Sequence, residues 1–171
     1  SYLRALELNC STSCITCCPC PAGTVCPDEG LATAQLCAPG HYNPDSGSQD
    51  ASSCRRCETG KYQTGEGSTA CVACEAGTYA AVPGSTACES CPPGGYCEEV
   101  GADSAAAFKQ CQPGTWSDVI GLNSSSGCVQ CREGEYQPIN GATSADDCRL
   151  CAPGSRAAGV ANAACQPCDA G

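Results

Sequence analysis

The sequence predicts a small disulfide-rich fold, an elongated tandem array of short irregular β-hairpin units with little regular secondary structure. Cysteine accounts for 21 of the 171 residues, far more than in an ordinary globular domain. Large apolar residues are scarce, with one phenylalanine, one tryptophan and no methionine. Glycine and cysteine also return at fixed spacing along the chain, which indicates an internal repeat.

Each repeat begins with an opening cysteine that is followed three residues later by a turn glycine. Neighbouring opening cysteines lie 17 or 20 residues apart, and they are Cys20, Cys37, Cys57, Cys74, Cys91, Cys111, Cys131, Cys151 and Cys168. The turn glycines are Gly23, Gly40, Gly60, Gly77, Gly94, Gly114, Gly134, Gly154 and Gly171. Repeats 1 to 8 are numbered from Cys20 to Cys151.

A second glycine, the tip glycine, follows ten residues after the opening cysteine. The tip glycines are Gly30, Gly47, Gly67, Gly84, Gly101, Gly121 and Gly141, and Ala161 takes this place in repeat 8. Because this spacing is the same in both repeat lengths, the three extra residues of the longer repeats must follow the tip. Glycine adopts positive φ without strain, so we expect each unit to turn at both places.

An aromatic position lies five residues after six of the opening cysteines. It holds Tyr42, Tyr62, Tyr79, Tyr96, Trp116 and Tyr136, whereas Val25 and Arg156 occupy it in the outermost full repeats. In a chain with so few large side chains, we expect the aromatic residues to pack against the neighbouring disulfide and glycine turn. The aromatic position is therefore the predicted core.

The other cysteines predict how the sulfurs pair. Six repeats have a closing cysteine three residues before the next opening cysteine, namely Cys54, Cys71, Cys88, Cys128, Cys148 and Cys165. Repeats 1 and 5 have Ala34 and Phe108 there, but each has gained a cysteine six residues after its opening cysteine, Cys26 or Cys97. Because loss and gain occur within one repeat, we expect every opening cysteine to pair inside its own repeat.

The expected pairs are Cys20–Cys26, Cys37–Cys54, Cys57–Cys71, Cys74–Cys88, Cys91–Cys97, Cys111–Cys128, Cys131–Cys148 and Cys151–Cys165. Closing a loop of about 15 residues contributes on the order of 3 kcal/mol in the chain-entropy model, so several such bonds can replace a hydrophobic core. Cys10, Cys14, Cys17 and Cys18 can form two further bonds in any of three arrangements. Cys168 is left over and begins a further repeat.

The recurring C-x-x-C pairs also fit two other interpretations, which the pattern disfavours. Cys54, Cys57, Cys71 and Cys74 have the spacing of a four-cysteine zinc site, yet the last two serve equally well as half of the next site. A redox dithiol needs one activated pair in an α/β domain, whereas here the pair recurs throughout. We therefore expect no metal.

Composition and isolated polar residues argue against enzymatic activity and against nucleic-acid binding. The net charge of −10 opposes binding to a phosphate backbone or an anionic membrane. The single histidine, His41, stands at a variable repeat position, and the acidic doublets Glu98-Glu99 and Asp146-Asp147 lack the alternating oxygen ligands of a calcium loop. We expect no enzyme, no cofactor and no direct membrane insertion.

Residues Asn123-Ser124-Ser125 form an N-glycosylation sequon in the long loop of repeat 6. A glycan there would have room, and together with the cysteines it indicates a secretory route and an extracellular or cell-surface location. The formal sequon at Asn9-Cys10-Ser11 is disfavoured because its middle residue is a cysteine expected to pair.

The pattern C-x-P-G-x-Y followed by C-x-x-C resembles the cysteine-rich repeats of the ephrin-receptor-like family. Each unit is similar to the one-disulfide submodule of tumour necrosis factor receptors. The resemblance covers residues 17–171 and implies an extracellular, elongated array with sequential bonds inside each unit. Similar arrays occur in receptor ectodomains, in protist surface proteins and in algal flagellar mastigonemes, so the resemblance does not by itself select a function.

The expected organisation has three parts. Residues 1–16 form a non-repeat segment with a short strand or helix end, which packs on a preceding domain or docks on another protomer. Residues 17–168 hold the eight repeats, and 169–171 start a truncated one.

Two functions follow from this organisation. The favoured one is a rod-like extracellular structural protein, a subunit of a filament or surface appendage such as a mastigoneme, whose partners are copies of itself or other filament subunits. The alternative is the ligand-binding stalk of a receptor ectodomain. Stacked repeats and loops rich in alanine favour the first. A ligand-binding surface would need exposed aromatic or arginine anchors, and apart from Arg55-Arg56 the loops offer few.

The pairing scheme predicts the result of peptide mapping without reductant. Every disulfide-linked peptide from residues 20–165 is expected to join two cysteines of the same repeat, and intact mass should rise on reduction and alkylation by the equivalent of at least eight bonds. Bonds between distant repeats, or bound zinc in the same sample, would contradict the scheme.

Overall fold

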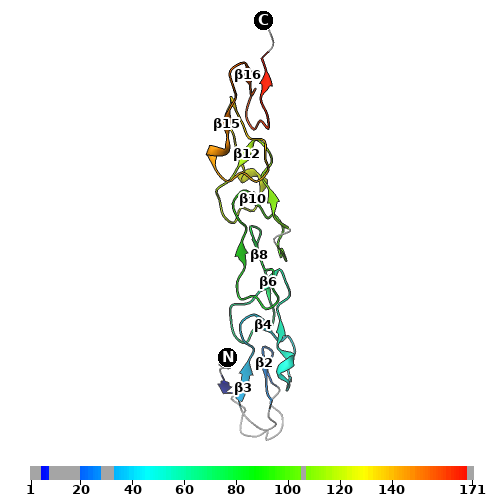
Figure 1. Ribbon diagram of the computed structural model, residues 1–171. Helices are drawn as coiled ribbons and strands as arrows, with labels where there is room; N and C mark the ends of the chain where they lie inside the picture. The colour runs from blue at the N-terminus through cyan, green and yellow to red at the C-terminus, as the bar shows by residue number, and fades with distance from the viewer. Residues whose placement is uncertain (1–4, 8–19, 28–32, 105–106, 169–171) are drawn as a thin grey trace, which may run out of the picture. The chain divides into compact units, whose positions relative to one another are not determined.

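The computed structural model describes residues 5–7, 20–27, 33–104 and 107–168, which form short strands and single turns of 3₁₀ helix (Figure 1). The chain divides into two compact units that alternate along the sequence. Unit 1 comprises residues 1–74 and 80–88, and unit 2 comprises residues 75–79 and 89–171.

Unit 1 contains one three-stranded sheet and two hairpins. The sheet has the order β1-β3-β2, and all its neighbours are antiparallel. In the hairpins, β4 pairs with β5 and β6 pairs with β7. The strands are β1 Ala5–Glu7, β2 Thr24–Val25, β3 Thr33–Leu36, β4 His41–Tyr42, β5 Arg55–Arg56, β6 Lys61–Tyr62 and β7 Val72–Ala73.

Unit 2 contains five antiparallel hairpins, each made of two strands that follow one another in the chain. Figure 1 shows the hairpins from β10 to β17 in chain order along this unit. The strands are β8 Thr78–Tyr79, β9 Glu89–Ser90, β10 Gly95–Tyr96, β11 Lys109–Gln110, β12 Thr115–Trp116, β13 Val129–Gln130, β14 Glu135–Tyr136, β15 Arg149–Leu150, β16 Ser155–Arg156 and β17 Gln166–Pro167. The predicted tandem array of disulfide-rich hairpins is thereby confirmed.

A tight turn at the turn glycine starts each hairpin. In repeat 6 the N–H of Thr115 donates to the carbonyl of Gln112 at 3.0 Å, and Gly114 between them has φ +84°. Pro113 precedes that glycine, and proline followed by a glycine with positive φ is the sequence of a type II turn. Local sequence therefore fixes where each hairpin begins.

Backbone hydrogen bonds join consecutive repeats in a pattern that recurs along the chain. The turn glycine is central, because its carbonyl accepts from the next opening cysteine and its N–H donates into the next repeat. At the joint between repeats 6 and 7 the bonds are Cys131 N–H to Gly114 O at 2.9 Å, Gly114 N–H to Gln137 O at 2.7 Å, Gly141 N–H to Cys111 O at 2.9 Å and Ser117 N–H to Ala142 O at 3.0 Å.

The turn glycines also lie against the repeat that follows two places later. A Cβ atom built on Gly94 would lie 2.5 Å from the carbonyl oxygen of Gly141, and one on Gly114 would overlap the carbonyl oxygen of Ala161. By contrast, a Cβ on Gly134 or Gly154 would meet no atom within 4 Å. At some turn glycines a side chain would therefore collide with a neighbouring repeat. At others glycine is favoured only because the backbone has a positive φ.

The buried residues are small and lie close to the disulfides. The opening cysteines from Cys20 to Cys131 are almost fully buried, with Cys37, Cys57, Cys74 and Cys91 at 0% exposure, whereas Cys151 is half-buried. The residue six places after the opening cysteine is also buried in most repeats, and in three of them it is polar: Asn43, Ser117 and Gln137. Their side chains accept from the backbone N–H two residues later, at Asp45, Val119 and Ile139 respectively. The hairpin thus supplies a partner for each of these side-chain oxygens, whereas the buried Nε2 of Gln137 has no hydrogen-bond partner among the described residues.

The non-repeat segment contributes one described strand, and this strand, β1, pairs with the first repeat. Ala5, Leu6 and Glu7 lie opposite Gln35, Ala34 and Thr33 of β3. Ala34 occupies the place of the closing cysteine in repeat 1, so a third strand lies beside the part of this hairpin that lacks its disulfide. Packing of the segment on a preceding domain or on another protomer stays a prediction.

Two matched alanine substitutions separate the two roles of the turn glycine. Gly114→Ala and Gly134→Ala both force a side chain into positive φ, at a cost of roughly 1–2 kcal/mol. Gly114→Ala must in addition displace the backbone of repeat 8, which adds about 1–3 kcal/mol of overpacking. Thermal unfolding with disulfides intact should therefore show a lower midpoint for Gly114→Ala than for Gly134→Ala. Equal midpoints would contradict the close approach.

Candidate functional site

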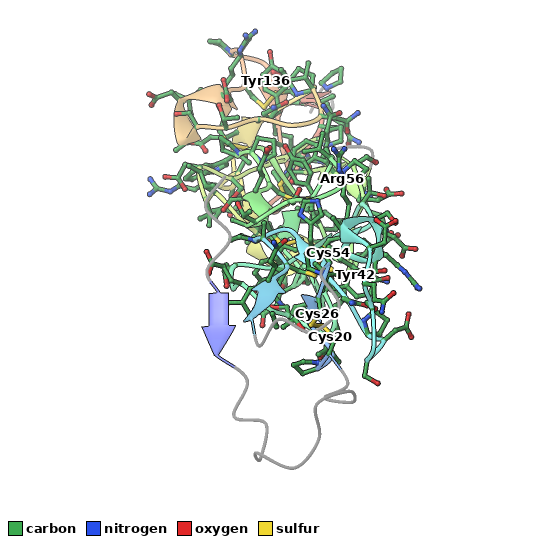
Figure 2. The ribbon with its side chains drawn as sticks, turned by 90° about the horizontal axis from the view of Figure 1, so that it is seen from below. Cys20, Cys26, Tyr42, Cys54, Arg56 and Tyr136 are labelled. Carbon is green, nitrogen blue, oxygen red and sulfur yellow. A yellow bond between two sulfur atoms is a disulfide. The ribbon has the colours of Figure 1, made fainter. Side chains whose placement is uncertain are left out.

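Eight disulfides within the described ranges form the framework of the repeats. They are Cys20–Cys26, Cys37–Cys54, Cys57–Cys71, Cys74–Cys88, Cys91–Cys97, Cys111–Cys128, Cys131–Cys148 and Cys151–Cys165. Each joins two cysteines of one repeat, with Cα atoms 5.5 to 6.3 Å apart. Figure 2 labels the first of them, Cys20–Cys26.

The remaining cysteines are not part of this framework. Cys168 is exposed and has no disulfide partner among the described residues. Cys10, Cys14, Cys17 and Cys18 lie outside the described residues, so their predicted bonds stay predictions.

In the six repeats that have an aromatic residue there, the aromatic position lies at the surface of the hairpin and is not the core that the sequence predicted, whereas Val25 of repeat 1 is buried. Tyr42, Tyr62, Tyr79, Tyr96, Trp116 and Tyr136 are all half-buried. The fully buried position is the next residue along the chain, because successive side chains of a strand point to opposite sides. Tyr42 does line a shallow hollow with Cys71 of the following repeat, which agrees with packing beside a neighbouring disulfide.

Each aromatic residue has a cross-strand neighbour two places before the next opening cysteine. Tyr42, Tyr96 and Tyr136 lie opposite the basic residues Arg55, Lys109 and Arg149. Tyr62 and Trp116 lie opposite Val72 and Val129, and Tyr79 lies opposite Glu89. A hydrogen bond to the Glu89 carboxylate, with its negative charge, raises the pKa of the Tyr79 hydroxyl. The hairpin faces thus differ in charge from repeat to repeat.

Repeat 5 replaces its missing closing cysteine with an aromatic contact. Phe108 stands at the closing place, and a Cβ built on Gly95 would lie 2.5 Å from Cζ of its ring. Gly95 is buried, and most other repeats have a larger residue at its position. The sequence contains this pair, but its spacing gave no sign that Phe108 and Gly95 are in contact.

The turn tips carry exposed apolar residues from repeat 4 onward. These residues come just before the tip glycine or its replacement, and they are Val82, Val100, Val119, Ile120, Ile139 and Val160, with Ile120 at 67% exposure. Repeats 2 and 3 have polar tips, Asp45-Ser46 and Gly65-Glu66. Exposed apolar residues that recur one or two places before the tip are a feature of contact surfaces.

The isolated polar residues make local contacts within the hairpins. His41 lies in β4, opposite Arg56, and its Nδ1 is 3.2 Å from the carbonyl of Pro39. Arg55 pairs with Asp45 at 2.9 Å, and both side chains are more than half exposed.

The acidic doublets are also tied to the backbone or to a basic side chain. Asp147 accepts from the N–H groups of Thr143 and Ser144 in a capping box that starts the 3₁₀ turn Ala145–Asp147. Glu98 pairs with Lys109 of the same repeat. Among the described residues there is no cluster of three or more side chains able to hold a metal ion.

Asn123, the predicted glycosylation site, is exposed in the loop that the Cys111–Cys128 disulfide closes. Ser124 caps the 3₁₀ turn Ser125–Gly127 through its hydroxyl, which accepts from the N–H of Ser126. Asn123 is therefore an exposed residue that directly precedes the N-cap of an ordered turn.

Part of this array matches a known protein family. Residues 60–107 match a family described as tyrosine-protein kinase ephrin type A/B receptor-like. The matched segment runs from the turn glycine of repeat 3 into repeat 5, and it includes the relocated Cys91–Cys97 bond. No curated protein matches the chain. No helix within the described ranges is long and apolar enough to cross a membrane.

We predict that Asn123 is the glycosylated residue when the chain is made in a secretory host. Treatment with an N-glycosidase should lower the mass by one glycan, and Asn123→Gln should remove that shift. Ser126→Ala lies outside the sequon and serves as the control. A glycan that remains on the Asn123→Gln variant would contradict the assignment.

Proposed function

Because the chain is an ephrin-receptor-like cysteine-rich repeat array, we propose that this extracellular protein serves as a structural subunit of a filament or surface appendage. Mastigonemes are one appendage of this kind. The observation that carries the proposal is the recurring joint, in which backbone hydrogen bonds at the turn glycines connect one disulfide-closed repeat to the next. Such joints support a spacer whose length is set by the number of repeats.

The exposed tips supply a surface for contacts between subunits. In repeats 4 to 8 the residues Val82, Val100, Ile120, Ile139 and Val160 face solvent. Burying each of them against another subunit would remove apolar surface from water, at about 25 cal/mol per Å². The proposed partners are copies of the chain or other filament subunits.

A ligand-binding receptor stalk is the alternative, and the family description favours it by naming a receptor. Protein ligands are commonly held by exposed tyrosine, tryptophan and arginine side chains. Here Arg55 is engaged with Asp45, and the stem of Arg56 lies beside Gly84, where a Cβ would be 3.7 Å from its Cδ. These contacts reduce the number of free anchors in unit 1, which supports the structural role.

Negative-stain imaging of native material tests the proposal. We expect polymers, and the double variant Val119→Ser, Ile120→Ser should shift the material toward single particles. Ser46→Ala changes the equivalent tip of repeat 2, where the residue is polar, and is expected to leave polymers intact. Isolated particles in the native material would instead support the receptor stalk.

A further inference from the structure

Repeat 5 differs from its neighbours in how much chain lies outside a disulfide loop. In the repeats with a closing cysteine, only two residues separate one disulfide from the next opening cysteine, as Val129 and Gln130 do between Cys128 and Cys131. In repeat 5, residues 98–110 all lie between Cys97 and Cys111, and no disulfide spans them.

Only non-covalent contacts hold the end of this segment against its hairpin. β11 pairs with β10 over two residues, Gly95 with Gln110 and Tyr96 with Lys109. The Phe108 ring lies on Gly95, and Lys109 pairs with Glu98 at the surface, where such pairs contribute little. Each of these contacts can break and form again while every covalent bond stays intact.

The joint between repeats 5 and 6 is non-covalent as well. Its bonds are Cys111 N–H to Gly94 O at 2.9 Å, Gly94 N–H to Ser117 O at 2.8 Å, Gly121 N–H to Cys91 O at 2.8 Å and Cys97 N–H to Leu122 O at 2.9 Å. Other joints use the same kinds of bond. At joints that follow a closing cysteine, such as the one between repeats 6 and 7, a two-residue covalent link also limits how far the two repeats can separate.

We propose that repeat 5 is a reversible yielding element, which lengthens under tension while every disulfide stays intact. When the chain is pulled from its ends, force passes through the disulfides and the links between them. A two-residue link spans three Cα steps, about 11 Å, and so has little slack. The link from Cys97 to Cys111 spans fourteen Cα steps, roughly 50 Å when extended.

Repeat 1 shares the relocated disulfide, Cys20–Cys26, but its second strand is held differently. β3 has a strand on each side, β1 and β2, whereas β11 pairs with β10 alone among the described strands. The two repeats are therefore expected to yield at different forces, with repeat 5 yielding first. In the proposed filament this would give extensibility without bond breakage, and only this biological use depends on the proposed function.

Single-molecule force spectroscopy of the full chain in non-reducing buffer tests the proposal. The wild type should lengthen in a discrete, reversible step that is assigned to repeat 5 by the double variant Cys97→Ser, Phe108→Cys. That variant restores the arrangement of the other repeats, because Cys91 can then bond to the cysteine introduced at position 108, and peptide mapping must verify this bond. The repeat 5 step should vanish, and the fully stretched oxidised chain should be shorter by about 40 Å.

A second variant tests what resists the force. Phe108→Ala should lower the force of the repeat 5 step and leave its length unchanged, whereas Phe108→Leu should have a smaller effect. The proposal is wrong if the step persists in the double variant once its new disulfide has been verified, or if the oxidised wild type shows no such step. Single particles in the imaging experiment would refute the filament and leave this result unaffected.

Discussion

The disulfide closed inside each repeat is the constraint on which the rest of the structure depends. The hairpin strands are mostly two residues long, too short to be stable alone in water. The opening cysteines from Cys20 to Cys131 are among the most buried of the described residues, so the same sulfur atoms that restrict the unfolded chain also fill the interior. A repeat of this kind needs no large apolar side chain, which explains how the array folds with a single phenylalanine.

Glycine is the second constraint, because repeats meet through their backbones. A turn glycine with positive φ directs its N–H into the next repeat, while its carbonyl accepts from the next opening cysteine. At Gly94 and Gly114 the lack of a Cβ also admits a carbonyl from the repeat two places later. Contacts therefore reach beyond the nearest neighbour, and a side chain at one turn would disturb three repeats.

The surface residues differ between repeats while the disulfides and the joints of most repeats stay the same. Residues at the aromatic position, at the turn tips and in the longer loops vary without altering a disulfide or a joint. Tyr79 opposite Glu89 and Tyr136 opposite Arg149 show opposite charge in the same structural place. Repeat 5 is the one described place in unit 2 where the framework itself changes, because Phe108, which packs on Gly95, stands where another repeat has its closing cysteine. A repeat array can thus vary its surface chemistry, and gain the extensibility proposed for repeat 5, without a new fold.

The spacing of Cys37, Cys54 and Gly40 by itself determined the repeat, the pairing and the turns, because disulfide closure and positive φ depend on residues close in sequence. The sequence could not show that Gln137 is buried while Tyr136 is not, because a two-residue strand has too little periodicity to reveal its inner side. The contact between Phe108 and Gly95, the pairing of Leu6 with Ala34 and the approach of Ala161 to Gly114 were decided only by the tertiary structure. These contacts join positions whose spacing follows no local rule, and packing of neighbouring strands and repeats brings them together.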